Sequence, residues 1–240
     1  MTKALIVIQA RMRSSRFPNK AMAMLSGRTV LSWVITRLLP LPYKLVVATG
    51  KSTINNPIIK QAEQLGVATI RGDEEDVMSR FALATREYPL ATTVVRVTGD
   101  NPLTDPALVQ AVIDSVENKN ADYAFVKMAP YGSGADAFKV RVLDQLAKVT
   151  RDKRHREHIN TFILDNHLRF DIRGIDLPPP LRRSDVRVTL DTKQDLERLA
   201  KIFEYLNDPT TAGIKEIIAA YDRLPKSAMS PPFLPELVQL

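Results

Sequence analysis

The sequence predicts an α/β fold: a single domain built on one mixed, mostly parallel sheet that is flanked by helices. Two observations lead to this prediction. Short apolar runs rich in β-branched residues alternate with segments of helical periodicity through the first half of the chain. This alternation is typical of parallel strands joined by right-handed crossovers. In addition, the 240 residues are 45% hydrophobic and 25% charged, which is sufficient for one domain with a real core.

Strands and helices alternate regularly in the first half of the chain. The run Lys3–Ala10 is continuous, apolar and β-branched, as in a buried parallel strand. Pro40 ends the first expected helix, and Pro57 and Gly66 delimit the second. The expected strands are Lys3–Ala10, Lys44–Thr49, Val67–Ile70, Thr92–Thr98 and Ala121–Val126, and the expected helices are Thr29–Leu39, Asn56–Leu65, Asp76–Arg86 and Asp105–Glu117.

The second half of the chain is less regular. A glycine-rich turn is expected at Tyr131–Gly134. Four prolines between Leu224 and Pro235 predict an extended tail, so we expect one domain over residues 1–223 and a Pro-rich tail over residues 224–240. The expected helices are Val140–Val149, Arg156–Asn166 and Thr192–Leu206, and the expected strands are Leu168–Ile175 and Val186–Leu190.

Composition excludes several classes of protein. The chain has no cysteine, which excludes disulfides, thiolate metal sites and cysteine nucleophiles and suits a reducing compartment. The N-terminal MTKALIVIQA has too short an apolar run for a signal peptide, and no stretch has membrane-spanning length. We therefore expect a soluble, cytoplasmic protein without a membrane partner.

The net charge of +7 favours an anionic partner. The cations gather in groups that are not interleaved with aromatic residues, which make up 6% of the chain. A base-stacking surface for nucleic acid is therefore not expected, and a small phosphate ligand fits better. The groups are Arg11, Arg13, Arg16 and Lys20; Arg151, Lys153, Arg154 and Arg156; and Arg182, Arg183 and Arg187.

The basic loop Arg11–Lys20 directly follows the first expected strand. Ligands of open α/β sheets bind beyond the carboxyl ends of strands, and arginine can grip phosphate oxygens bidentately. The loop lacks the G-x-x-x-x-G-K-[ST] pattern of a P-loop, and no glycine precedes Gly27, which excludes a dinucleotide fingerprint. Four cations alone are more typical of a solvated basic loop, so the phosphate hypothesis depends on other residues.

Two aspartates follow β-forming segments, Asp100 in RVTGDNP and Asp191 in VTLDT. A carboxylate at such a strand end is suited to Mg²⁺, which takes one or two carboxylates together with substrate phosphates. Asp100 is equally compatible with a turn cap, and Asp191 with a helix N-cap. Two such aspartates together favour a metal site. We interpret Thr192 and Asp195 as a helix cap and a first-turn acid.

His155 and His158 lie beside Glu157, but no third ligand has a spacing suited to zinc. A zinc site is therefore not expected. Met22, Met24 and Met128 are interpreted as core filler.

Taken in order, the motifs resemble those of a known family. They are QARMRSSRFPNK, ATG, RGDEEDVMSRF, RVTGDNP, GAD, REH and LDTKQDL. The set resembles the cytidylyltransferases that make CMP-activated acidic sugars, most closely the SpsF-like spore-coat polysaccharide branch. The resemblance extends from Ala4 to Leu206, and its specificity lies in the set rather than in any one motif.

The resemblance implies a nucleotide-diphospho-sugar transferase-like domain of the GT-A type. It implies attack by a sugar oxygen on the α-phosphorus of CTP, with Mg²⁺ as cofactor, a small anionic acceptor and a homodimer. Lys20, Asp100 and Asp191 would be catalytic, with both aspartates holding Mg²⁺. The nucleotide side would comprise Gln9, Ala10, Arg11, Arg16, Lys20, Arg71, Gly72 and Arg80, and the acceptor side Gly134, Asp136, Arg156, Glu157 and His158.

Two positions depart from the family pattern and leave alternatives open. Arg13 stands where similar proteins usually have glycine, and Phe138 stands where much of the SpsF-like branch has glutamate. The missing glutamate, with the spare cations Arg182, Arg183 and Arg187, leaves open a phosphonate, phospho-sugar or polyol acceptor and another nucleotide. A non-catalytic basic nucleotide- or RNA-binding protein is a further alternative, which the two aspartates disfavour.

Overall fold

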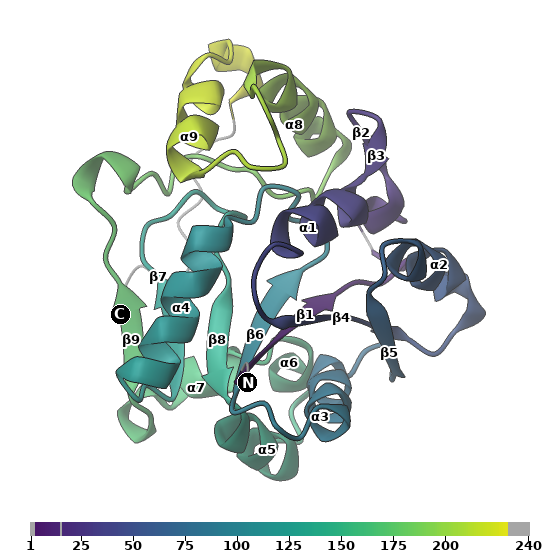
Figure 1. Cartoon of the computed structure of the whole chain (residues 1–240), viewed down its shortest axis with the longest axis vertical. Helices are drawn as coiled ribbons and strands as arrows, with labels where there is room; N and C mark the ends of the chain where they lie inside the picture. Colours follow the sequence, from purple (N-terminus) through teal and green to yellow (C-terminus); the bar gives the residue numbers. More distant parts are fainter. Residues whose placement is uncertain (1–2, 15, 230–240) are drawn as a thin grey trace.

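A seven-stranded sheet forms the centre of the computed structural model, which describes residues 3–14 and 16–229 (Figure 1). Within this part of the chain, β8 alone runs antiparallel to its neighbours in the sheet, and the predicted mixed, mostly parallel sheet is confirmed. In spatial order the strands are β5 (Ala68–Gly72), β4 (Lys44–Gly50), β1 (Ala4–Gln9), β6 (Thr93–Thr98), β8 (Asp136–Lys139), β7 (Tyr123–Val126) and β9 (Ile172–Ile175).

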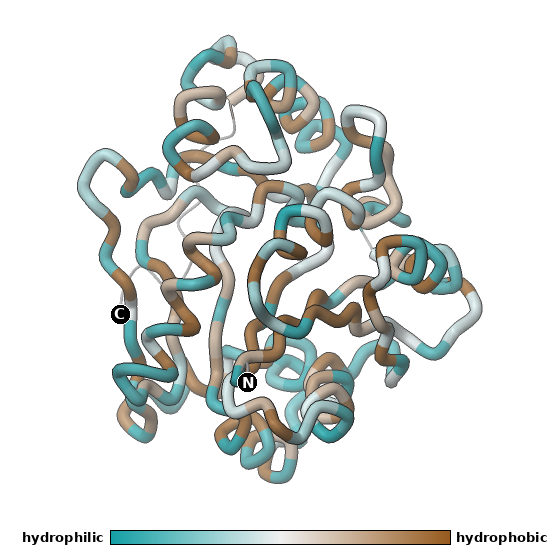
Figure 2. Tube along the Cα trace, viewed as in Figure 1, coloured by the Kyte–Doolittle hydropathy of each residue, from teal (hydrophilic) through white to brown (hydrophobic). Residues whose placement is uncertain are grey.

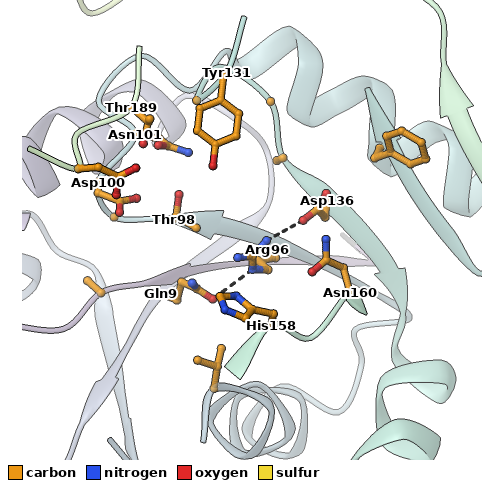
Figure 3. Close-up of a pocket in the computed structure, with 18 of the residues that line it drawn as sticks. Gln9, Arg96, Thr98, Asp100, Asn101, Tyr131, Asp136, His158, Asn160 and Thr189 are labelled. Atoms are coloured by element: carbon orange, nitrogen blue, oxygen red, sulfur yellow. Dashed lines mark hydrogen bonds and ion pairs between the residues drawn. The ribbon is translucent and has the colours of Figure 1, made fainter. Parts of the chain in front are cut away.

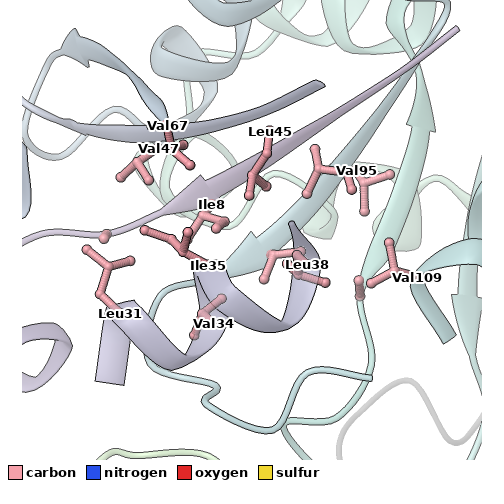
Figure 4. Close-up of a cluster of buried hydrophobic side chains, with 14 of the residues drawn as sticks. Ile8, Leu31, Val34, Ile35, Leu38, Leu45, Val47, Val67, Val95 and Val109 are labelled. Atoms are coloured by element: carbon pink, nitrogen blue, oxygen red, sulfur yellow. The ribbon is translucent and has the colours of Figure 1, made fainter. Parts of the chain in front are cut away.

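Hydrophobic residues follow one another along the central strands (brown in Figure 2), and their side chains fill a core on each face of the sheet because helices cover both faces. Successive side chains of a strand point to opposite faces, so Ile6 and Ile8 enter one core while Leu5 and Val7 enter the other. The first core lies under α1 (Val30–Leu38), α2 (Asn56–Gln64) and α4 (Pro106–Asn118), and part of it is shown in Figure 4. The second lies under α3 (Val77–Glu87), α5 (Val140–Val149) and α7 (Thr161–Asp165).

A third hydrophobic cluster joins α8 (Lys193–Tyr205) and α9 (Ile214–Asp222) to the rest of the domain. The two helices pack side by side (Figure 1), and Phe203 of α8 meets the edge of Trp33 of α1 with ring centroids 5.0 Å apart. A small hairpin, β2 (Met24–Leu25) and β3 (Arg28–Thr29), contributes Leu25 to the same cluster. Neither α9 nor this hairpin was expected from the sequence.

The structure corrects two predicted elements of the second half. Val186–Leu190 is not a strand: only Arg187 forms an isolated bridge, to Tyr131. Val186, Val188 and Leu190 are apolar because they are buried in the third cluster, not because they belong to the sheet. The predicted helix Arg156–Asn166 is divided into α6 (Lys153–Glu157) and α7, which begins at Thr161.

Boundaries of other elements also differ. The strand expected at Leu168–Ile175 contains only β9, because residues 167–169 form a 3₁₀ turn in which Leu168 is 91% exposed.

Met24 and Met128 are 62% and 40% exposed, so their interpretation as core filler was wrong. Leu224, the first residue of the predicted tail, is buried in the third cluster, while residues 230–240 lie outside the described part. The division at residue 223 remains a prediction.

No helix in the described part of the chain combines the length and apolar character that crossing a bilayer requires.

Candidate active site

A cavity of about 950 Å³ opens at the carboxyl ends of β1 and β6. These neighbouring parallel strands end together, with Gln9 opposite Thr98. β4 lies on the other side of β1, so the strand order reverses here, and such a switch point is where open α/β sheets bind ligands. Gly99 allows the two strand ends to remain close, because a Cβ there would lie 2.9 Å from the Cβ of Ala10.

Lys20 and two aspartates form a charged centre in this cavity, which we call the Lys20 centre. The Lys20 ammonium pairs with Asp100 Oδ2 and lies 2.8 Å from Asp191 Oδ1. Asp100 follows β6, and Asp191 precedes α8; the Leu190 amide donates a 2.9 Å hydrogen bond to the Asp100 carbonyl, which holds these segments together. The side chains of Lys20, Asp100 and Asp191 are only 17, 20 and 10% exposed, so solvent screens their interaction weakly.

Asp191 is held in place by groups behind the Lys20 centre. Arg187 Nη2 donates to its Oδ2 at 2.6 Å, and Asp195 Oδ2 accepts the Asp191 amide at 3.0 Å. Thr192 and Asp195 form a capping box at the start of α8, so their predicted cap role is confirmed. Because Thr192 is the N-cap, the alternative of an N-cap role for Asp191 was wrong.

Lys20 and Asp191 stabilise each other's charged form. Burial acts to lower the pKa of Lys20, but its ion pairs with Asp100 and Asp191 outweigh burial and raise that pKa above its ordinary value. Burial acts to raise the pKa of Asp191, but the hydrogen bond from Lys20 and the nearby charges of Arg16 and Arg187 outweigh it and lower that pKa.

The basic loop lies along one wall of the cavity and places cations at different depths. Arg16, whose side chain is 65% exposed, donates to Asp191 Oδ1 at 3.0 Å, and Arg11 Nη2 pairs with Glu157 at 2.6 Å. Arg13 is exposed at the rim. The loop is anchored from beneath, because the Met12 amide donates to the fully buried Asn55 at 2.9 Å.

The remaining predicted nucleotide-side residues do not all reach the cavity. Gln9, Ala10 and Arg80 line it. Gly72 packs beneath Arg80, since a Cβ at Gly72 would lie 2.6 Å from Arg80 Cγ. Arg71 does not line the cavity: it is exposed, and its guanidinium donates to the Lys51 carbonyl at 2.7 Å.

The opposite part of the cavity floor is a hydrogen-bonded network centred on Asp136 (Figure 3). Arg96 of β6 and Asp136 of β8 face each other across the sheet, and Arg96 Nη1 donates to Asp136 Oδ2 at 2.8 Å. Arg96 Nε donates to Gln9 at 3.2 Å, and the Tyr123 hydroxyl donates to Asp136 Oδ1 at 3.0 Å. Arg96 was not among the site residues expected from the sequence, although a lone cation in the apolar run TTVVRVT was a usable signal.

Of the other predicted acceptor-side residues, Gly134, Glu157 and His158 line the cavity and Arg156 does not. Arg156 points away because successive helical residues are rotated by about 100°. Its Nε donates to Asp76 at 2.7 Å, which ties α6 to the start of α3. Cavity-lining residues that sequence reasoning missed include Tyr131, Asn160 and Thr189 (Figure 3).

The structure shows the surroundings of the residues that motivated an unusual acceptor, which remains a prediction. Arg183 pairs with Asp185 and Asp222, Arg187 pairs with Asp191 and Asp195, and Arg182 donates to the Leu177 carbonyl. Arg183 and Arg187 are therefore not spare, whereas the contact of Arg182 is with a carbonyl oxygen. Phe138 is fully buried against the Tyr123 ring and does not line the cavity, so its side chain is a core contact.

The Lys20 centre has donors suited to a hard divalent cation. Carboxylate oxygens of Asp100 and Asp191 approach one ammonium group, so one cation can be shared between them. Within residues 3–14 and 16–229, no three His, Asp or Glu side chains converge. Further ligands would therefore come from substrate phosphates and water, as Mg²⁺ prefers.

We expect the His158 imidazole to be neutral at pH 7. Burial is the largest cause and lowers its pKa below the ordinary 6.5; Glu157 opposes this, and the nearby charges of Arg96, Arg154 and Arg11 act in the same direction as burial. An NMR titration, assigned with His158→Asn, should give a midpoint below 6.5. Because the unfolded chain then binds more protons, this group costs stability as pH falls below 6.5, and His158→Asn should reduce that loss. A midpoint above 6.5 would contradict this environment.

The fold and this site define a class, the nucleotidyltransferases. The structure is similar to that of a cytidylyltransferase from Leptospira borgpetersenii, with TM-score 0.85 and 26% identity over 93% of this chain and 95% of the other. It shares its fold with a CMP:2-keto-3-deoxy-manno-octonic acid synthetase complexed with CTP, with TM-score 0.66 and 18% identity over 85 and 99% of the two chains.

The family model for cytidylyltransferases matches residues 5–216, and the chain belongs to that family. Among its relatives, the uncharacterized protein MJ1063 of Methanocaldococcus jannaschii is 32% identical over 93% of this chain and 92% of its own length. The spore coat polysaccharide biosynthesis protein SpsF of Bacillus subtilis is 26% identical over 95% of this chain and 98% of its own.

Proposed function

We propose that this protein transfers CMP from CTP to an acidic sugar or a related acceptor and releases pyrophosphate, in the synthesis of activated sugars. The observation that carries the proposal is the Lys20 centre beside the basic loop. In this cavity, a ligand with several phosphates would meet the cations of the loop. It would also meet the carboxylates of Asp100 and Asp191, which can share a divalent cation. A binding protein has no need of both aspartates.

The cations of the loop would bind the triphosphate. Arg11, Arg16 and Lys20 all line the cavity, so cations of one loop can neutralise the β- and γ-phosphates. Charge that develops on the departing pyrophosphate would be stabilised by the same side chains. A Mg²⁺ held by Asp100 and Asp191 would supply further neutralisation at the α-phosphate.

The acceptor would bind over the Arg96–Asp136 network. Its hydroxyl oxygen forms a bond to the α-phosphorus, the bond from that phosphorus to pyrophosphate breaks, and the hydroxyl proton is lost to solvent. Arg96, Asp136 and the neutral His158 can hold hydroxyl groups of a sugar in the orientation for this attack. Such positioning supplies much of the rate enhancement in transfers that need little covalent chemistry from the protein.

Pyrophosphate release tests the proposal. Purified protein would be incubated with Mg²⁺, one nucleoside triphosphate and a panel of 2-keto-3-deoxy sugar acids, uronic acids, phospho-sugars, phosphonates and polyols. We expect release that requires CTP, an acidic sugar and the metal, and that stops with EDTA. Release with ATP, GTP or UTP equal to that with CTP would contradict the nucleotide. Release only with phosphonates or polyols would mean that the acceptor belongs to one of those classes and is not an acidic sugar. Absence of both release and CTP binding would reject the function.

A further inference from the structure

Lys20 makes two kinds of interaction that exclude each other. Its ammonium lies between Asp100 and Asp191 and contacts an oxygen of each. Those carboxylates are the ones suited to hold a divalent cation, and a cation shared by them needs the space of the ammonium. The same lysine lines the cavity, where its ammonium is available to a triphosphate.

We propose that Lys20 is an internal competitor of the metal, so that the metal ion enters the site together with the nucleotide and binds weakly without it. This inference rests on the proposed metal role of Asp100 and Asp191. Lys20 leaves the carboxylates when the triphosphate offers its ammonium new anionic partners. The two aspartates are then free for the metal, and binding of each ligand favours the other.

The charges around the carboxylates support this competition. Lys20, Arg16 and Arg187 all contact Asp191, and Lys20 also contacts Asp100. Three cations against two carboxylates leave a local excess of one positive charge, which repels a free divalent cation. The nearby Asp195 does not change this balance, because Arg198 pairs with it at 2.5 Å. A triphosphate would reverse the sign of the local charge.

The side chain of Lys20 is also suited to leave. It is a flexible lysine at the start of a short 3₁₀ turn, residues 20–22, and contacts the aspartates only through its terminal ammonium. Arg187, by contrast, also pairs with Asp195 through Nε, and its guanidinium lies 5.1 Å from the Tyr131 ring centroid. Lys20 can therefore exchange partners while Arg187 stays behind Asp191.

Binding of Mn²⁺ to the full-length protein, followed by the EPR signal of free Mn²⁺, tests the inference without any acceptor. In the wild type, CTP should tighten Mn²⁺ binding at least about tenfold, because it removes the competitor. Lys20→Met should bind Mn²⁺ at least about tenfold more tightly than the wild type when no nucleotide is present, since Asp100 then loses the ammonium and Asp191 keeps Arg16 and Arg187. The same variant should bind CTP more weakly. These opposite changes are not expected from a general loss of structure.

Two further variants serve as controls. Lys20→Arg keeps a competing cation and should bind Mn²⁺ no more tightly than the wild type. Arg141→Met removes an equal charge from a side chain that is 67% exposed and does not line the cavity, and should change Mn²⁺ affinity by less than about threefold. Circular dichroism would check that each variant is folded. The comparison of wild-type Mn²⁺ affinity with and without CTP does not depend on any variant.

The competition is overturned if Lys20→Met binds Mn²⁺ no more tightly than the wild type without CTP. It is also overturned if the wild type binds CTP but has the same Mn²⁺ affinity with and without it. A wild type that does not bind CTP at all would reject the proposed function instead, and the nucleotide-free comparison would still decide the competition.

Discussion

Asp100→Asn should slow pyrophosphate release roughly a thousandfold at saturating CTP and acceptor. The amide has the size of the carboxylate and can still accept a hydrogen bond from Lys20, so the cavity keeps its shape. It lacks the negative charge that a hard divalent cation requires from its few protein ligands. The metal-dependent gain in CTP affinity, measured by calorimetry, should disappear together with the activity.

A matched aspartate serves as the control for this substitution. Asp171 forms an exposed ion pair with Arg173 at 2.8 Å and does not line the cavity. Asp171→Asn should therefore remain within twofold of the wild-type rate (~0.4 kcal/mol), as expected for a surface pair. If Asp100→Asn retained half of the wild-type rate, the metal role of this carboxylate would have to be abandoned.

The largest effect on stability should come from Arg37→Leu, with a loss of about 4 kcal/mol in the free energy of unfolding. Arg37 of α1 is 1% exposed, and its guanidinium donates to the carbonyls of Thr104, Pro209 and Ala212 at 3.0, 2.5 and 2.7 Å. Leucine would leave these carbonyls without that donor beside the third cluster. Urea unfolding followed by the fluorescence of Trp33, the only tryptophan of the chain, would measure the loss.

Two substitutions calibrate this measurement. Arg37→Lys keeps the charge but cannot reach three carbonyls, so about half of the loss is expected. Arg141 pairs with Asp122 through a side chain that is 67% exposed, and Arg141→Met should change the free energy of unfolding by less than about 0.5 kcal/mol. A loss below about 1 kcal/mol for Arg37→Leu would mean that other groups or water replace its hydrogen bonds.

The regular elements of the first half could be predicted because each carries its own local signals. β1, β4, β5, β6 and β7 are short apolar runs, and the helices between them begin or end at proline, glycine or capping residues. Helix α9 also carries such a signal, since Glu216 accepts a hydrogen bond from the Gly213 amide in a capping box. That helix was missed although its signal was present in the sequence.

Other elements had no sufficient local signal. β8 has only four residues, DAFK, and is a strand because it fits between β6 and β7. Val186–Leu190 has a strong strand pattern, but within the described residues it forms only one isolated bridge to a neighbouring segment. It therefore remains an extended segment under α8. In both cases pairing partners distant in the sequence decided the outcome.

By itself, the sequence determined the fold class, the basic loop after β1 and the two aspartates after β-forming segments, because residue type, order and periodicity are local properties. The tertiary structure alone decided which of these side chains meet. It brought Lys20 between Asp100 and Asp191, placed Arg96 against Asp136, and turned Arg156 away toward Asp76. These contacts join residues 40 to 171 positions apart, and a one-dimensional pattern does not encode the direction of a side chain at the end of a strand or helix.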